Sequence, residues 1–174
     1  MHTGLEEEKD GIDKIATYYA ERAKGGAGLI VTGGISPNIQ GWTGPFAARM
    51  STKKHAKQHQ KITAAVHKEG GKICMQILYS GRYGYHPFNV ALSKIKSPIT
   101  HFKRFKLTQT GITRTIRDFV NCATLSKIAG YDSVEIMGSE GYLINQFIVK
   151  RTNKRTDSWG GDYENRMRLP IALV

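Results

Sequence analysis

The chain has 174 residues, and 40% of them are hydrophobic, which is enough for one packed domain and excludes intrinsic disorder. Its 26 Lys and Arg exceed its 14 Asp and Glu, so the formal net charge is +12. No apolar run reaches about 18 residues and no secretory signal is visible, so we expect a cytoplasmic protein with no membrane partner. Cys74 and Cys122 lie too far apart for a CxxC metal clip, and we expect neither a disulfide scaffold nor a metal site.

The basic residues gather in two runs, 94–106 and 150–155, which contain no acidic residue. A basic surface favours anionic partners such as nucleic acid, acidic membranes or phosphorylated small molecules. No RRM, KH or helix-turn-helix signature accompanies the charge, so we expect a solvated lysine-rich face and no nucleic-acid partner. An RNA- or anion-binding protein is therefore the least favoured hypothesis.

Amphipathic segments alternate with short apolar runs along the chain. Apolar residues recur at helical spacing in a first segment that ends at Gly25 and Gly26, and the apolar run 27–31 follows immediately. The same order of helix, glycine and apolar run occurs twice more, and a last helical pattern follows. The sequence therefore predicts helices over 10–24, 53–68, 112–129 and 165–174, and strands near 27–33, 72–77 and 132–137.

The predicted strands are continuous apolar runs, a pattern typical of parallel strands that are buried on both faces in α/β proteins. The segments after the strands are long and the turns before them are short, as in a (β/α)8 TIM barrel. A doubly wound sheet is the alternative, but residues 33–37 (GGISP) do not form its GxGxxG phosphate loop. A complete barrel needs about 250 residues, so we expect an α/β chain that forms a partial (β/α)8 barrel, truncated at both ends.

Three motifs stand after the third predicted strand: GSEGYLINQF at 138–147, NKRTDSWGG at 153–161 and ENRMR at 164–168. Together they resemble the pattern of the Old Yellow Enzyme family of FMN-dependent barrels. Within that family the sequence is most similar to bacterial members that reduce 2,4-dienoyl-CoA with NADPH, in stretches such as MHTGLEE, LIVTGGISP and QILYSGRYGY. The resemblance implies that residues 1–174 are the N-terminal portion of an FMN-binding oxidoreductase barrel that reduces an activated C=C bond.

The resemblance also implies roles for single residues. Tyr142 matches the active-site tyrosine, and a phenol with an ordinary pKa of about 10 stays protonated at neutral pH and can donate a proton to the substrate carbon. Gln76 stands within an apolar run, where its amide must find partners, and it matches the residue at the pyrimidine edge of the flavin. Gly34 lets the backbone approach a planar cofactor, and Met1 and His2 match the stretch under the flavin. We therefore expect these last four residues to bind FMN.

A substrate site is implied for four consecutive residues after the tyrosine: Arg151, Thr152, Asn153 and Lys154. Their cations and hydrogen-bonding groups suit the thioester or phosphates of an enoyl- or dienoyl-CoA. A solvated basic loop is the alternative for the same segment. The FMN-phosphate site of the family lies in the second half of its barrel, and the iron–sulfur and FAD segments of the full-length members are not encoded in this sequence.

Some positions depart from the family pattern. Met137 and Glu140 stand where many members place a His and a His or Asn that hold a carbonyl oxygen, which favours the dienoyl-CoA type over a general enone reductase. Tyr79 replaces a common His, and Pro170 is expected to interrupt the last helix.

Two alternatives stay open beside the reductase. In the first, the chain is a catalytically inactive half-barrel. In the second, it is a module that works only after association with a second copy or with a missing C-terminal half. Three histidines of the second predicted helix are expected to be surface or core residues rather than ligands: His55, His59 and His67.

Overall fold

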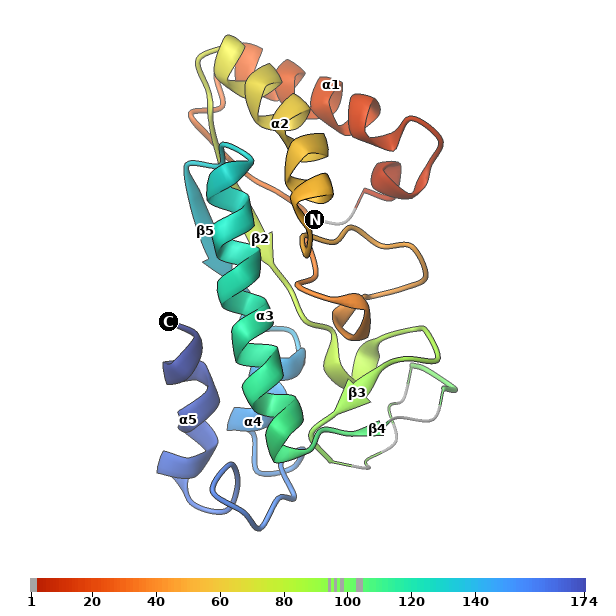
Figure 1. The fold of residues 1–174 in the computed structure, drawn as a ribbon, viewed down its shortest axis with the longest axis vertical. Coiled ribbons are helices and arrows are strands. Elements are labelled where there is room, and N and C mark those ends of the chain that lie inside the picture. Colours follow the sequence, from red (N-terminus) through yellow and green to blue (C-terminus); the bar gives the residue numbers. More distant parts are fainter. Residues whose placement is uncertain (1–2, 94, 96, 98, 103–104) are drawn as a thin grey trace.

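The computed structural model describes residues 3–93, 95, 97, 99–102 and 105–174 (Figure 1). Within these residues, the main sheet contains β1 (Leu29–Val31), β2 (Lys72–Ile77) and β5 (Ser133–Ile136), and a small sheet joins β3 (Val90–Ala91) to β4 (Phe105–Lys106). The α-helices are α1 (Gly11–Lys24), α2 (Lys53–Lys68), α3 (Gln109–Ile128), α4 (Leu143–Ile148) and α5 (Tyr163–Leu173). Short 3-10 helices are η1 (Leu5–Glu7), η2 (Ile39–Gly41) and η3 (Gly81–Tyr83).

The main sheet is parallel, with the strand order β1–β2–β5, and each of its strands follows one of the helices α1, α2 and α3. This confirms the predicted succession of helices and parallel strands. The outer strands are shorter than the predicted ranges 27–33 and 132–137. At β1 the regular ladder ends at Val31, and an isolated parallel bridge between Ile35 and Ile77 continues the pairing beyond it.

Side-chain caps determine where three helices begin. The side chains of Thr52, Thr108 and Asp162 accept a hydrogen bond from a backbone N–H in the first turn of α2, α3 and α5. As a result, α3 and α5 begin three and two residues earlier than predicted. The predicted interruption at Pro170 is wrong, because α5 continues through it to its last residue while the neighbouring Leu169 is fully buried.

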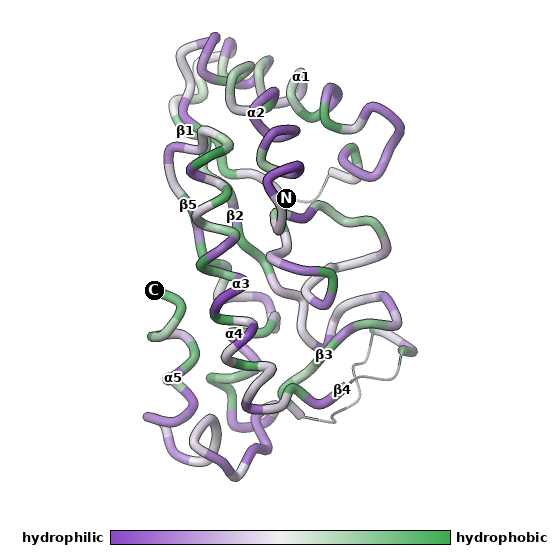
Figure 2. The backbone as a smooth tube through the Cα atoms, in the orientation of Figure 1, coloured by the Kyte–Doolittle hydropathy of each residue, from purple (hydrophilic) through white to green (hydrophobic). Residues whose placement is uncertain are grey.

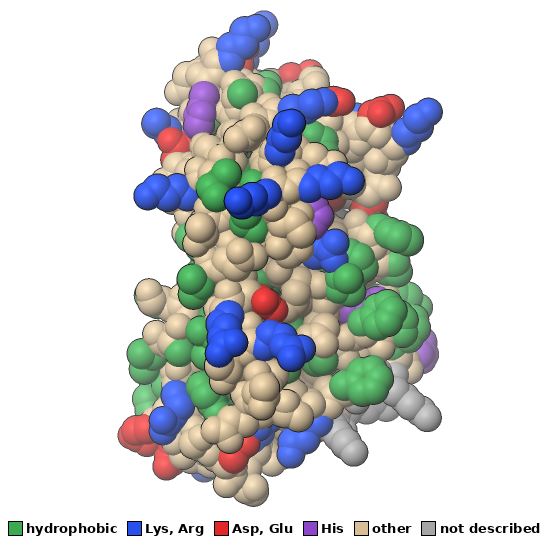
Figure 3. Space-filling model, viewed as in Figure 1, with side chains coloured by type: hydrophobic (Ala, Val, Ile, Leu, Met, Phe, Trp, Pro, Cys, Tyr) green, Lys and Arg blue, Asp and Glu red, His purple; other side chains and the backbone are tan. Residues whose placement is uncertain are grey.

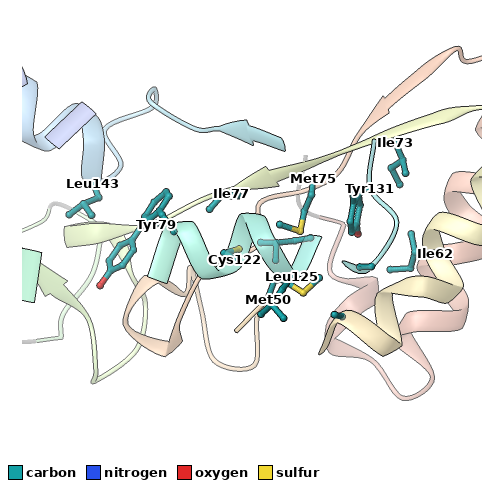
Figure 4. Packing of buried hydrophobic residues seen from close by; sticks show 14 of the residues in the cluster. Met50, Ile62, Ile73, Met75, Ile77, Tyr79, Cys122, Leu125, Tyr131 and Leu143 are labelled. Atoms are coloured by element: carbon teal, nitrogen blue, oxygen red, sulfur yellow. The ribbon is translucent and has the colours of Figure 1, made fainter. Parts of the chain in front are cut away.

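The hydrophobic core follows β2 along its length (Figure 4). Ile73, Met75 and Ile77 alternate along this strand and are essentially inaccessible to solvent. Leu125 and Cys122 of α3 lie beside them in Figure 4. Each fully buried aliphatic side chain of this kind contributes about 1.5–3 kcal/mol to folding. Figure 2 shows the same arrangement as a hydrophobic β2 that runs beside helices of mixed polarity.

The opposite face of the main sheet carries no second layer within the described residues. Residues paired in a parallel ladder point to the same face, and the register places Leu29, Val31, Gln76 and Glu135 together on this one. Leu29 is 58% exposed and Val31 is 40% exposed. The prediction that the strands are buried on both faces is therefore wrong for β1 and β5, because three strands cannot close around an interior and fill it.

The surface is basic on the face shown in Figure 3, where Lys and Arg outnumber Asp and Glu. Most of the basic residues in the predicted run 94–106 lie outside the described residues, namely Lys94, Lys96, Lys103 and Arg104. Both cysteines are free and buried. Among the described residues, no helix combines the length and apolarity needed to cross a membrane.

Candidate active site

Tyr142 lies where β5 gives way to α4, directly before the first residue of that helix. Glu140 (φ 59°) and Gly141 (φ 77°) both adopt left-handed backbone, which turns the chain sharply ahead of the tyrosine. Glycine is required at 141, because a Cβ there would lie 2.6 Å from the Tyr83 ring. The rings of Tyr83 and Tyr142 meet edge to face, with 6.3 Å between their centroids.

The Tyr142 side chain lines a cavity of about 340 Å³ with Thr43, Tyr83, Ile99 and Glu140. Burial, followed by the nearby Glu140 carboxylate, raises the pKa of Tyr142 above its ordinary value. The phenol is therefore protonated at neutral pH and lines a cavity, so that its proton is available to a ligand there. Its catalytic role stays a prediction that this geometry suits.

Gln76 lies near the C-terminal end of β2 on the uncovered face of the sheet. Its register partner on β5 is Glu135, and Gln76 Nε2 donates a hydrogen bond to Glu135 Oε1 at 2.9 Å. This bond fixes the amide and leaves Gln76 Oε1 without a hydrogen bond among the described residues. The strand ends thus present one oriented acceptor oxygen.

Gly34 follows β1, and its missing side chain is required by packing. A Cβ at this position would lie 2.5 Å from Leu78 Cδ1 and 2.8 Å from Leu78 Cβ. The residue therefore allows the segment after β1 to lie against the segment after β2, and contact with FMN stays a prediction. Met1 and His2 lie outside the described residues.

The structure divides the predicted substrate segment. Arg151 and Thr152 line a larger cavity beside that of Tyr142. The Thr152 hydroxyl donates to the carbonyl of Gln146 at 2.9 Å or of Val149 at 3.0 Å. Lys154 is exposed and does not line that cavity. Of the four residues, the first two are placed to meet a ligand there.

Asn153 belongs to a buried hydrogen-bond network formed by the NKRTDSWGG motif, called the motif network below. It is 5% exposed, and its amide donates to two backbone carbonyls at 2.8 Å and accepts from the Arg155 N–H at 3.1 Å. The equally buried Arg155 forms a bidentate ion pair with Asp157, and its hydrogen bonds hold the pKa of Asp157 below its ordinary value. A Cβ on Gly160 would lie 2.5 Å from the Arg155 carbonyl. The geometry therefore favours a structural role for Asn153, and its contact with substrate stays a prediction.

The positions that depart from the Old Yellow Enzyme pattern differ in their surroundings. Tyr79 is 2% exposed and stacks on Phe119 with an interplanar angle of 9°, so its ring belongs to the core. Met137 is half-buried, and its N–H donates to the carbonyl of Ile77 at 3.1 Å. Glu140 is the departure that reaches the Tyr142 cavity.

The three histidines of α2 are surface or core residues, as predicted. His59 is buried with its Nδ1 2.8 Å from the Tyr131 hydroxyl, and His67 Nε2 lies 2.8 Å from Asp132 Oδ2. His55 Nδ1 accepts a hydrogen bond from the backbone N–H of the residue before the cap of α2. In the part of the chain that the structure describes, no group of three or more His, Cys, Asp or Glu side chains could hold a metal ion.

Residues 1–174 match the NADH:flavin oxidoreductase / NADH oxidase family along their whole length. The chain belongs to this family. A metal reductase of Desulforamulus reducens is 36% identical over 182 residues, which cover 100% of this chain and 26% of that protein. The resemblance carried by the GYL, NxRxD and ENR motifs is thereby confirmed at the level of the family.

Solved structures confirm the partial barrel. The chain matches the Old Yellow Enzyme homologue from Zymomonas mobilis with a TM-score of 0.84 and 32% identity, over 91% of this chain and 48% of that one. It matches 2-naphthoyl-CoA reductase in its complex with 2-naphthoyl-CoA with a TM-score of 0.86 and 31% identity, over 92% of this chain and 27% of that one. The chain thus spans about half, or less, of the proteins it matches.

The flavin of this family is FMN, and the residues present fit one edge of its ring. Barrel chemistry takes place at the C-terminal ends of the strands. There the bond from Gln76 Nε2 to Glu135 orients the amide, and Gln76 Oε1 has no hydrogen-bond partner among the described residues. Such an oxygen suits the N–H of the pyrimidine edge of a flavin. In this chain, Gln76 would hold that edge, and the segment around Gly34 would lie beside it.

Two neighbours of the predicted site were missed in the sequence. Tyr83 contacts Tyr142, and Glu135 orients Gln76. Tyr83 stands in the stretch QILYSGRYGY, which carries the family resemblance without pointing to this residue. Glu135 could have been found by pairing the two apolar runs in parallel, because the register then places it opposite Gln76.

Proposed function

We propose that this chain forms the first part of an FMN-dependent oxidoreductase that reduces a C=C bond conjugated to a thioester, with NADPH as the ultimate donor. When bound, FMN supplies the hydride. The observation that carries the proposal is Tyr142, a protonated phenol that lines a cavity next to the strand ends. The substrate that fits best is an enoyl- or dienoyl-CoA.

The residues of this chain then have separate tasks. Tyr142 holds a proton at its hydroxyl oxygen and delivers it to the substrate carbon that does not receive the hydride. Tyr83 packs against the tyrosine edge to face and limits its rotation. Gln76, held by Glu135, binds the flavin edge and sets its position at the mouth of the barrel.

The acyl-CoA specificity has two supports. Met137 and Glu140 occupy the positions where many family members hold a carbonyl oxygen, so a general enone lacks its usual partners here. In addition, one structural neighbour at 31% identity is a 2-naphthoyl-CoA reductase in complex with its acyl-CoA ligand.

The test uses a complete barrel in which residues 1–174 replace the matching half of the Zymomonas mobilis homologue. This chimeric barrel is the parent protein of the test. We expect it to retain FMN, to accept electrons from NADPH, and to pass them to 2,4-hexadienoyl-CoA faster than to cyclohexenone. Tyr142→Phe keeps the ring and removes only the hydroxyl. Its reduction by NADPH should be unchanged in stopped-flow traces, while its reoxidation by the dienoyl-CoA should slow by about 10²–10⁴-fold.

Tyr163→Phe is the matched control. It removes the same hydroxyl group, but Tyr163 is 59% exposed on α5 and does not line the Tyr142 cavity. It should reoxidise at the parent rate. Equal reoxidation rates in the parent and Tyr142→Phe proteins would show that Tyr142 is not the proton donor. A preference for cyclohexenone over the dienoyl-CoA would contradict the substrate class.

A further inference from the structure

A cavity of about 730 Å³ lies where the long loop after β2 meets α4 and the residues that follow it. This volume is within the usual range of small-molecule sites, about 300–1,000 Å³. Two arginines and a histidine line it, namely Arg82, Arg151 and His101. None of the described residues that line it is acidic, and they come from segments about 40–70 positions apart in the sequence. The fold has therefore assembled a cationic cavity that neither segment contains by itself.

Arg82 is held in place on one side of this cavity. Its guanidinium donates to the Tyr83 hydroxyl at 2.9 Å and lies 4.9 Å from the centroid of that ring. Its backbone N–H donates to Gln146 Oε1 at 3.1 Å, and the buried Gln146 amide also donates to the Gly141 carbonyl at 2.7 Å. Gln146 thus ties η3 to the chain around α4 and fixes the position of Arg82 relative to the other wall.

Arg151 on the other wall is differently placed. It is exposed and forms no ion pair or hydrogen bond with any residue that the structure describes. Asn145, which also lines the cavity, likewise makes no side-chain hydrogen bond within the described ranges. A guanidinium presents donors in a fork that matches two phosphate oxygens, and an amide adds a further donor. These groups are suited to a ligand with several anionic oxygens.

The cationic cavity adjoins the proposed reaction site. Tyr83 lines both this cavity and the smaller one that contains Tyr142, and Gly141 lines the larger one directly beside the tyrosine. A ligand with a reactive group at Tyr142 can therefore extend past Tyr83 toward Arg82 and Arg151. Such a ligand has an uncharged reactive end and a phosphate-bearing end.

We infer that this cavity binds the phosphate groups of an adenosine nucleotide that is part of the substrate or of the electron donor. The inference rests on the proposed function for the connection to Tyr142. Two ligands share the required chemistry: acyl-CoA, with its diphosphate and 3′-phosphate, and NADPH, with its diphosphate and 2′-phosphate. Arg151, Arg82 and Asn145 bind the phosphate oxygens, and Gln146 is a positioning residue.

Isothermal titration calorimetry of the 174-residue chain with 3′,5′-ADP, 2′,5′-ADP and adenosine tests the inference without flavin. At least one bisphosphate should bind, and adenosine should not. Arg151→Ala should weaken that binding about tenfold or more, since charge-assisted hydrogen bonds to phosphate are lost. Arg151→Lys should give an intermediate loss, because it keeps the charge and loses the fork. Tighter binding of 3′,5′-ADP identifies the acyl-CoA, and tighter binding of 2′,5′-ADP identifies NADPH.

Arg114→Ala is the matched control, because Arg114 is exposed on α3 and does not line the cavity. It lowers the net charge by the same amount and should leave bisphosphate binding unchanged. No binding of either bisphosphate, or equal losses in Arg114→Ala and Arg151→Ala, overturns the inference. Tyr142→Phe should bind the bisphosphates like the parent chain, so a failure here is distinguishable from a failure of the proton-donor proposal.

Discussion

The buried His59 predicts how the stability of the fold changes with pH. Burial, followed by the nearby His55, lowers the pKa of His59 from 6.5 to about 4. The unfolded chain therefore binds more protons than the folded chain between these values, so that this contribution to stability is complete above pH 6.5 and is lost as the pH falls toward 4. The difference between the two values corresponds to roughly 3 kcal/mol in full.

Urea unfolding followed by tryptophan fluorescence measures this loss. Between about pH 7.5 and about pH 5, the linkage relation gives a fall of about 2 kcal/mol in the free energy of unfolding from His59 alone. His59→Gln keeps a hydrogen-bonding group for the Tyr131 hydroxyl, which lies 2.8 Å from His59 Nδ1, and removes the titration. The variant should lose about 2 kcal/mol less than the parent over this interval.

The other titrating groups do not produce the same difference. Burial also lowers the pKa of His55 and His86, and both contributions remain in the variant. The carboxyl of Asp132 has a pKa held well below 3.8, since its hydrogen bonds outweigh the effect of burial, and it titrates only at lower pH. Equal losses in the parent and His59→Gln proteins would refute the reasoning, because they would mean that His59 is protonated in the folded chain without cost.

Two further predictions concern the motif network around Asn153 and the uncovered face of the main sheet. Asn153→Ala should lower the free energy of unfolding by about 3 kcal/mol, because two carbonyls and an N–H lose buried partners. Asn153→Asp keeps the acceptor for the Arg155 N–H but turns a carboxylate oxygen toward the two carbonyls, so it should lose at least as much in the same urea assay, and a smaller loss would contradict this account. The chain should self-associate through the uncovered sheet face, where Leu29 and Val31 are 58% and 40% exposed. Sedimentation velocity should show concentration-dependent association that Val31→Lys reduces and Val120→Lys, an equally apolar exposed site on α3, does not; a monomeric parent chain at high concentration would refute it.

The sequence by itself determined the helices α1, α2, α3 and α5 and the three parallel strands of the main sheet, but not α4 or the small sheet of β3 and β4. Helical spacing of apolar residues and the glycines that end each helix are local signals, so the succession of α1, β1, α2, β2, α3 and β5 could be predicted. The three motifs after the third predicted strand likewise identified the family, because together they make a long and specific pattern. The boundaries were less accurate where a cap such as Thr108 outweighed the apolar pattern.

Only the tertiary structure decided which residues of the motifs are available to a ligand. Asn153 and Arg151 stand two positions apart in one basic segment, yet the first is buried by backbone partners and the second faces a cavity. Gly34 is a second example. Glycine is needed there because a Cβ would collide with Leu78, which lies after a different strand, β2. Sequence patterns report the face on which a residue lies, whereas its partners come from segments brought near by folding. The cationic cavity could not be predicted from the sequence for this reason, because its walls meet only when the loop after β2 packs on α4.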